Sequence, residues 1–140
     1  MKKILNEIKV RITANANSEK IARGIVSAFL ESENPTVEEL GDIRCSVSEA
    51  VDNCVSHAYK DTSDKNYIYI SARVYDNGEF SIEVSDNGCG FDTSRIGEHQ
   101  NEIGFVVMRS FMDSVDIKSK IGKGTTVLMR KRLTRWETVK

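Results

Sequence analysis

The amino-acid sequence predicts a single domain of the α+β class. Three segments have the alternating apolar pattern, or the β-branched and aromatic content, of half-buried strands. Two long segments repeat apolar residues at helical spacing. The chain has 140 residues, which is long enough for a core of its own but short for two. We therefore expect one domain over residues 1–140, in which strands and helices pack together.

The first strand and the first helix are expected near the N-terminus. Residues 7–13 alternate, and the apolar side of this strand consists of Ile8, Val10 and Ile12. A helix would follow from Asn17 or Ser18, either of which could cap it, to about Ser32. Its buried face would contain Ile21, Ile25 and Phe29.

The second helix is expected to begin after Pro35. Thr36 and Glu39 have the spacing of a capping box, in which each side chain hydrogen-bonds the backbone amide of the other residue. The helix would continue to about Tyr59. The residues that it would bury are Leu40, Ile43, Val47, Ala50 and Cys54.

Two strands joined by a tight turn are expected next. Residues 67–75 and 79–85 have strand composition or alternation. Asp76-Asn77-Gly78 lies between them, and Asn-Gly readily takes the positive φ angles of a type I′ turn. We therefore predict a β-hairpin over these segments.

The remainder of the chain predicts a lid, a short helix and a second hairpin. Residues 92–102 are polar and have no clear period, and we expect a mobile lid there. A short apolar helix over 104–113 would follow. Strands at 115–120 and 125–133 would pair through the turn that contains Gly122 and Gly124.

Charge and cysteine content favour a cytoplasmic protein without direct nucleic-acid binding. The formal net charge is -1, so no bulk positive field attracts DNA. Cys45, Cys54 and Cys89 form an odd set without a C-x-x-C pair, which fits reduced thiols. The N-terminal residues contain no apolar run long enough for a signal peptide or a membrane span.

The first candidate functional pair is Glu49 and Asn53 on the second helix. These residues are four apart, so their side chains project side by side from successive turns. An Asn oxygen is a reasonable ligand for Mg²⁺, and a carboxylate one turn earlier could deprotonate a hydroxyl near that metal. The alternative is a solvated helix face on which the two groups have no function.

The second candidate is the loop that follows residues 79–85, where the sequence reads SDNGCGF. Asp86 could accept a hydrogen bond from an exocyclic amine such as that of adenine. Gly88 and Gly90 allow a close approach by a ligand. Taken alone, an Asp-Asn-Gly loop is more often an ordinary turn.

Two glycine motifs complete the set. Gly104 stands before a predicted helix, where free backbone amides suit phosphate, and residues 122–126 read GKGTT. The order of the four motifs is more specific than any one of them. In this order they resemble the nucleotide-binding motifs of the superfamily of DNA gyrase, MutL, heat-shock chaperone ATPases and histidine kinases.

Within that superfamily the chain most resembles the anti-sigma factors that are also serine protein kinases, above all the sporulation anti-sigma F type. The resemblance runs from about Ile8 to Leu133. It is carried by SEKIAR at 18–23, PTVEEL at 35–40, VSEAVDN at 47–53 and FMDSVDIKSKIGKGTT at 111–126. It implies a two-layer sandwich, a histidine-kinase-type ATPase domain with helices on one face of a mixed β-sheet.

The resemblance also implies roles for individual residues. Glu49 would be the catalytic base for phosphoryl transfer from ATP to a serine hydroxyl, and Asn53 would hold Mg²⁺. Asp86 would bind the adenine amine. Further nucleotide contacts would come from Gly88, Gly90, Gly104 and Thr125. Arg23 matches an arginine that in this family faces the sigma factor and the anti-anti-sigma partner; the alternative is a solvated helix arginine.

The predicted function is that of a homodimeric anti-sigma factor that binds ATP and Mg²⁺, sequesters a sigma factor and phosphorylates an anti-anti-sigma protein on serine. The lid is shorter than in relatives, and Asn101 and Glu102 replace a serine and a glycine. A non-catalytic binding module, nucleotide-gated or nucleotide-free, is therefore the alternative. A detached histidine kinase domain would need an upstream phospho-accepting histidine, and the sequence contains only His57 and His99.

Overall fold

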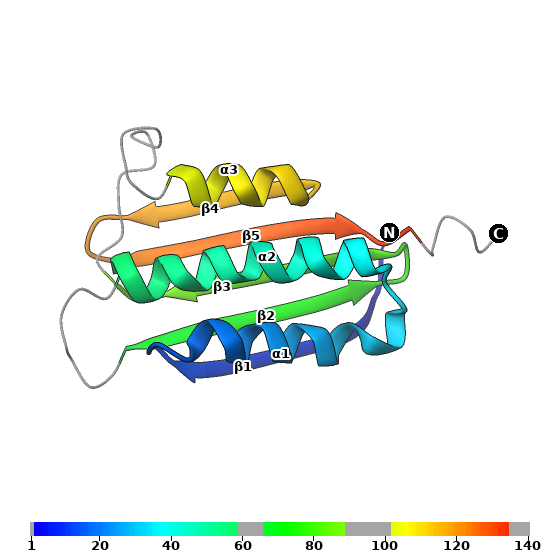
Figure 1. The fold of residues 1–140 in the computed structure, drawn as a ribbon, viewed down its shortest axis with the longest axis horizontal. Helices are drawn as coiled ribbons and strands as arrows, with labels where there is room; N and C mark the ends of the chain where they lie inside the picture. The colour runs from blue at the N-terminus through cyan, green and yellow to red at the C-terminus, as the bar shows by residue number, and fades with distance from the viewer. Residues whose placement is uncertain (1, 59–65, 89–101, 135–140) are drawn as a thin grey trace.

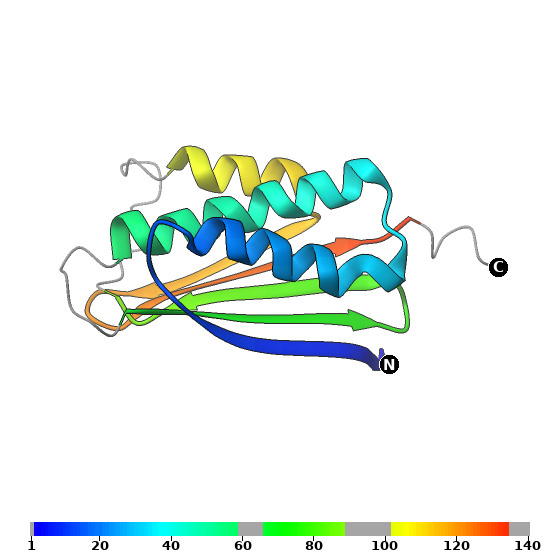
Figure 2. The same ribbon diagram turned by 60° about the horizontal axis from the view of Figure 1, so that its bottom comes forward.

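The structure, a computed structural model, describes residues 2–58, 66–88 and 102–134. In these ranges five strands form one sheet, and three helices lie over one of its faces, which confirms the α+β class (Figures 1 and 2). None of these helices is long and apolar enough to cross a membrane. The strands are β1 (Ile4–Thr13), β2 (Tyr67–Tyr75), β3 (Glu79–Asp86), β4 (Ser114–Lys120) and β5 (Gly124–Arg132). The helices are α1 (Ser18–Leu30), α2 (Val37–Asn53) and α3 (Glu102–Phe111), with a 3₁₀ turn at Glu31–Glu33 and a π-helical turn at Cys54–Ala58.

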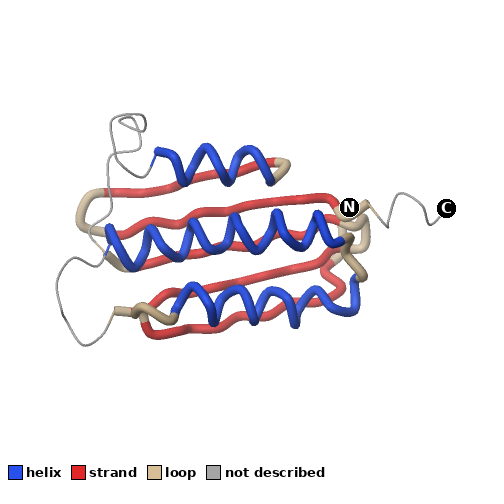
Figure 3. Tube along the Cα trace, in the orientation of Figure 1, coloured by secondary structure: helices blue, strands red, loops and turns tan. Residues whose placement is uncertain are grey.

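The strand order is β1-β2-β3-β5-β4, and every neighbouring pair is antiparallel. The sheet is therefore not mixed, which corrects that part of the expectation. Two successive helices, α1 and α2, return the chain to the end of the sheet at which β1 finished, so β2 runs opposite to β1 (Figure 3). β3 and β4 are parallel, but β5 lies between them and is antiparallel to both.

The buried face of helix α1 is not the expected one, which contains Ile21, Ile25 and Phe29. Its buried residues are Ser18, Ala22, Val26 and Leu30. Ile21 is 46% exposed, and Ile25 and Phe29 are only half-buried. The hydroxyl of Ser18 donates a hydrogen bond to the Thr13 carbonyl oxygen at 2.8 Å, which ties the start of the helix to the end of β1. Asn17 precedes the helix without a side-chain capping bond.

The capping box at the start of α2 is confirmed. The Glu39 amide donates to Thr36 Oγ1 at 3.0 Å, and the Thr36 amide donates to Glu39 Oε1 at 2.9 Å. The second oxygen of Glu39 accepts from the Thr134 amide at 2.7 Å, which ties the chain after β5 to the same helix. The α-helix ends at Asn53, before the predicted end near Tyr59, a residue outside the described ranges. A π-helical turn takes over at Cys54.

The β2–β3 hairpin forms as predicted, but its turn is not of type I′. The Gly78 amide donates to the Tyr75 carbonyl at 3.0 Å, and Gly78 has a φ of 86°. Among the described non-glycine residues only Asn34 has a positive φ, so Asn77 does not adopt the conformation that type I′ requires. The loop therefore corresponds to a type I turn followed by a glycine bulge, the usual solution when three residues join two strands.

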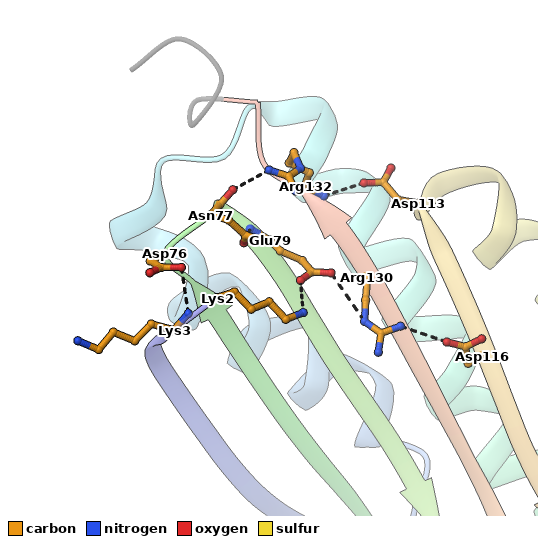
Figure 4. A network of polar contacts seen from close by, with 9 residues as sticks. All are labelled: Lys2, Lys3, Asp76, Asn77, Glu79, Asp113, Asp116, Arg130 and Arg132. Carbon is orange, nitrogen blue, oxygen red and sulfur yellow. Dashed lines mark hydrogen bonds and ion pairs between the residues drawn. The ribbon is translucent and has the colours of Figure 1, made fainter. Parts of the chain in front are cut away.

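A polar network closes the end of the sheet at which both chain termini lie (Figures 1 and 4). Glu79 of β3 pairs with Lys2 and, at 3.7 Å, with Arg130, which also contacts Asp116 of β4 at 3.1 Å. The Arg132 amide donates to Asp113 Oδ2 at 2.7 Å. These contacts link four segments of the sheet, and the predicted functional residues lie at the opposite end.

Candidate functional site

Glu49 and Asn53 lie near the C-terminal end of α2, where Gly104 of α3 packs directly against both. A Cβ atom on Gly104 would stand 3.0 Å from Glu49 Oε2 and 3.6 Å from Asn53 Nδ2. A side chain at position 104 would therefore crowd the Glu49 carboxylate, whereas it would meet the Asn53 carboxamide at an ordinary contact distance. The structure thus brings three of the sequence-predicted site residues together.

The position of Gly104 within α3 differs from the expectation. The helix begins at Glu102, so Gly104 is its third residue and does not precede it. The first backbone amides of an α-helix have no carbonyl partner within the helix, and they carry the positive end of its dipole. Gly104 still lies in this first turn, next to Glu49 and Asn53, so the arrangement remains suitable for an anion.

The carboxyl group of Glu49 has an elevated proton affinity. Partial burial raises its pKa, and the negative charges of Asp52 and Glu19 raise it further. A carboxylate that holds a proton more strongly than usual is better suited to accept one from a hydroxyl. The environment of Glu49 therefore fits the role of a general base.

Asn53 carries a buried polar atom without a partner. Its Nδ2 atom makes no hydrogen bond to any described residue. A buried amide in this state is costly, and a ligand that accepts its hydrogen bond would remove the cost. Within the described ranges no three His, Cys, Asp or Glu residues are grouped as a metal site. A Mg²⁺ ion held jointly by one side chain and by ligand phosphates is compatible with this arrangement.

Asp86 ends β3 as a buried carboxylate, only 6% exposed. Its Oδ1 accepts from the Gly88 amide at 2.9 Å, its Oδ2 accepts from the Cys54 thiol at 3.3 Å, and the Thr125 backbone supplies a further hydrogen bond. Burial raises the pKa of Asp86, although these donors oppose the shift. Burial and the charge of Asp86 also raise the pKa of Cys54 well above its usual range, so its thiol keeps its proton and acts as the donor.

The first two residues of β5 pack closely against Asp86. Gly124 has a φ of 97°, and a Cβ atom there would lie 2.2 Å from the Asp86 carbonyl oxygen. Thr125 is the cross-strand partner of Asp86, and its hydroxyl is 2.7 Å from that of Ser119. The predicted adenine-end residues Asp86, Gly88 and Thr125 are therefore neighbours.

Sequence reasoning assigned no role in the site to Cys54, Ser119 or the close contact of Gly124. Cys54 was expected on the buried face of its helix, but its contact with a carboxylate 32 positions away depends on how the helix layer sits on the sheet. The positive φ of Gly124 was the more accessible signal, because a Gly-x-Gly turn often needs it. Gly90 and residues 92–101 of the expected lid lie outside the described residues, and Glu102, which was expected to end the lid, is instead the first residue of α3.

Arg23 lies beside this site and is not part of it. Its Nη1 atom donates to Glu19 Oε1 at 2.8 Å and to Ser48 Oγ at 3.1 Å. Ser48 immediately precedes Glu49, so these contacts place the guanidinium of α1 against α2 near Glu49. One third of the Arg23 side chain remains exposed, which leaves it accessible to a partner.

The fold corresponds to a known class of domain. The family model of the histidine kinase-like ATPase domain matches residues 12–131, so the chain belongs to that family. Its relatives within the family include anti-sigma F factors. The protein of that name from Caldanaerobacter subterraneus subsp. tengcongensis is 38% identical, over 93% of this chain and 96% of the relative. The one from Priestia megaterium is 32% identical, over 92% and 94% respectively.

Solved structures agree on the fold. The crystal structure of the RsbU and RsbW domains of a Mycobacterium tuberculosis protein superposes with a TM-score of 0.73 at 22% identity, covering 91% of this chain and 32% of that one. The histidine kinase domain of an Erythrobacter litoralis blue-light activated kinase gives a TM-score of 0.62 at 20% identity, covering 86% of this chain and 63% of that one. The expected histidine-kinase-type fold is therefore confirmed.

Proposed function

We propose that this protein is a cytoplasmic, homodimeric anti-sigma factor of the sporulation type that binds ATP with Mg²⁺, sequesters a sigma factor and phosphorylates an anti-anti-sigma protein on serine. The contact between Gly104, Glu49 and Asn53 carries the proposal, because it joins a base, a carboxamide and a helix N-terminus at one point. The relatives named anti-sigma F factor support the partner assignment.

The site would bind the two ends of a nucleotide through different layers of the fold. Asp86 at the end of β3 would accept the adenine amine, beside Gly88 and Thr125. Asn53 and the first turn of α3 would hold the phosphates. ATP would supply the phosphoryl group, and Mg²⁺ would neutralise part of the negative charge of the phosphates. The unpartnered Nδ2 of Asn53 supports a ligand at this position.

Glu49 would act on the serine of the protein substrate. The serine oxygen would form a bond to the γ-phosphorus while the bond from that phosphorus to ADP breaks, and the Glu49 carboxylate would accept the serine proton. The raised pKa of Glu49 supports this role. Arg23, accessible beside Glu49, would contact the sigma factor or the antagonist.

Isothermal titration with ATP and with ADP, each with and without Mg²⁺, tests nucleotide binding. Micromolar, magnesium-dependent affinity, roughly -8 kcal/mol, is the expected result. Asn53→Ala should remove the magnesium dependence, whereas Asn6→Ala, an exposed asparagine on β1, should not. Unchanged affinity in Asn53→Ala would remove Asn53 from the metal site.

Phosphotransfer separates this function from a non-catalytic binding module. The short sequence from 91 to 103, which was expected to contain the lid, and the acidic residue Glu102 within it favour the non-catalytic module. Radiolabelled ATP and a candidate antagonist provide the assay. Glu49→Gln should bind ATP and fail to transfer. Wild-type protein that binds the sigma factor but never labels an antagonist would support the non-catalytic module.

A further inference from the structure

The thiol of Cys54 contacts the carboxylate at the centre of the adenine end of the site. Cys54 is 3% exposed and Asp86 is 6% exposed, and the Sγ to Oδ2 distance is 3.3 Å. Because a thiol can donate and an ionised carboxylate can only accept, the direction of this hydrogen bond is fixed. Cys54 therefore acts on the side chain to which the proposed function assigns recognition of adenine.

We propose that Cys54 is a positioning residue for purine recognition, whose thiol holds Asp86 in the orientation that accepts a hydrogen bond from the 6-amine of adenine. This role rests on the proposed function, because it requires an adenine nucleotide as the ligand. Cys54 itself does not touch the nucleotide in this arrangement. It acts through Asp86.

The count of hydrogen bonds at Asp86 supports a specific geometry. An ionised carboxylate has about four lone-pair sites. The Gly88 amide bonds Oδ1, the Cys54 thiol bonds Oδ2, and the Thr125 backbone supplies a third donor. Three donors from the described residues leave about one acceptor site for a ligand, which suits a single N–H group. The carboxylate is also oriented before the ligand arrives, and this preorganisation reduces the entropy lost on binding.

Cys54 also connects the two ends of the proposed nucleotide site. It follows Asn53 directly and begins the π-helical turn at the end of α2. Such turns are frequent at functional sites. The helix that carries Glu49 and Asn53 is therefore hydrogen-bonded through its next residue to the strand that carries Asp86. The simpler alternative is that the thiol only fills space in the core, to which it also belongs.

The two explanations differ in their effect on one chemical group of the ligand. Dissociation constants would be measured by titration for ATP and for purine riboside 5′-triphosphate, which has hydrogen in place of the 6-amine. The ratio of the two constants reports amine recognition alone. For the wild type we expect ATP to bind about tenfold to a hundredfold more tightly, the usual range for a hydrogen bond to a charged group.

Three substitutions of Cys54 then test the thiol. Cys54→Ala and Cys54→Val remove the donor, and Val also fills the space, so at least one folded variant without a donor is available. Both should lower the ratio by about threefold to tenfold. Cys54→Ser should keep it within about twofold, because a hydroxyl also donates. Cys45→Ser replaces the exposed thiol of the same helix and should leave the ratio unchanged.

The outcomes distinguish the role of Cys54 from the proposed function. If Cys54→Ala and Cys54→Val weaken the binding of both nucleotides equally, the ratio of the two dissociation constants keeps its wild-type value. The thiol then contributes only to packing, and the proposal is wrong. If the wild type binds both nucleotides equally, Asp86 does not read the amine and Cys54 has no recognition to support. If the wild type binds neither, the proposed function itself fails, and the role of Cys54 fails with it.

Discussion

Gly124→Ala should damage the adenine end of the site and the stability of the fold together. The residue has a φ of 97°, and the added methyl group would lie 2.2 Å from the Asp86 carbonyl oxygen and 3.0 Å from the Asn87 Cα. Both contacts are with backbone, so no side chain can rotate away. β3 and β5 must therefore separate where Asp86 faces Thr125.

The cost has two parts. A non-glycine residue at positive φ loses about 1–2 kcal/mol, and forced overpacking adds about 1–3 kcal/mol. The sum of about 2–5 kcal/mol corresponds to a fall in Tm of about 6–15 °C for a domain of this size. Displacement of the Asp86 peptide should also weaken ATP binding.

Gly122→Ala is the matched control. Gly122 lies in the same turn with a φ of 82°, but a Cβ atom there would meet nothing within 4 Å. Gly122→Ala should therefore show only the cost of a non-glycine residue at positive φ, which lowers Tm by about 3–6 °C. Thermal unfolding followed by circular dichroism compares the two variants. Equal losses in Gly124→Ala and Gly122→Ala would refute the argument that the close approach to Asp86 requires glycine.

Three further substitutions test the two ends of α2. Gly104→Ala should reduce phosphotransfer and ATP affinity more than stability, because its methyl group contacts Glu49 Oε2 at 3.0 Å while alanine favours the helix; wild-type activity would contradict this. Glu39→Gln should lower Tm most at neutral pH. Burial acts to raise the pKa of Glu39, but the hydrogen bonds from Thr36 and Thr134 outweigh it and lower this pKa below 4.5. The stabilisation by the Glu39 carboxylate is therefore lost as the pH falls through the pKa of the folded state. Glu49→Gln should do the opposite and raise Tm at neutral pH, because burial and neighbouring charges raise the pKa of Glu49 above 4.5; the difference should vanish below that value. Melting curves of nucleotide-free protein between about pH 4 and pH 8, which includes the upper part of a carboxyl titration, compare the two variants. A change in Tm of the same sign in both variants would contradict this reasoning.

Local signals in the sequence predicted most of the fold. The capping box of Thr36 and Glu39 formed as predicted because both of its hydrogen bonds lie within one turn. The rotation of α1 could not be predicted from the helix alone, since apolar residues lie on two adjacent faces and only the packed fold shows that Val26 and Leu30 are buried while Ile21 is exposed. Likewise the turn type at Asn77 depended on the number of residues between paired strands.

The candidate site shows the same division between local and long-range information. The four-residue spacing of Glu49 and Asn53 is enough to predict that both side chains project from one face of a helix. Their contact with Gly104 and the link from Cys54 to Asp86 arise only when the helices lie on the sheet. A pattern that describes one element at a time contains no information on such pairs.

The two ends of the sheet differ in how well their polar groups are satisfied. At the end with the termini, Glu79, Asp113 and Asp116 accept from basic side chains or backbone amides. At the other end, the folded state raises the pKa of Asp86 and leaves Asn53 Nδ2 without a partner among the described residues. Charged and polar groups held in this way lower stability until a ligand supplies their partners. A nucleotide that binds only the folded state would therefore stabilise the protein, by about 2.7 kcal/mol at a hundredfold excess over Kd.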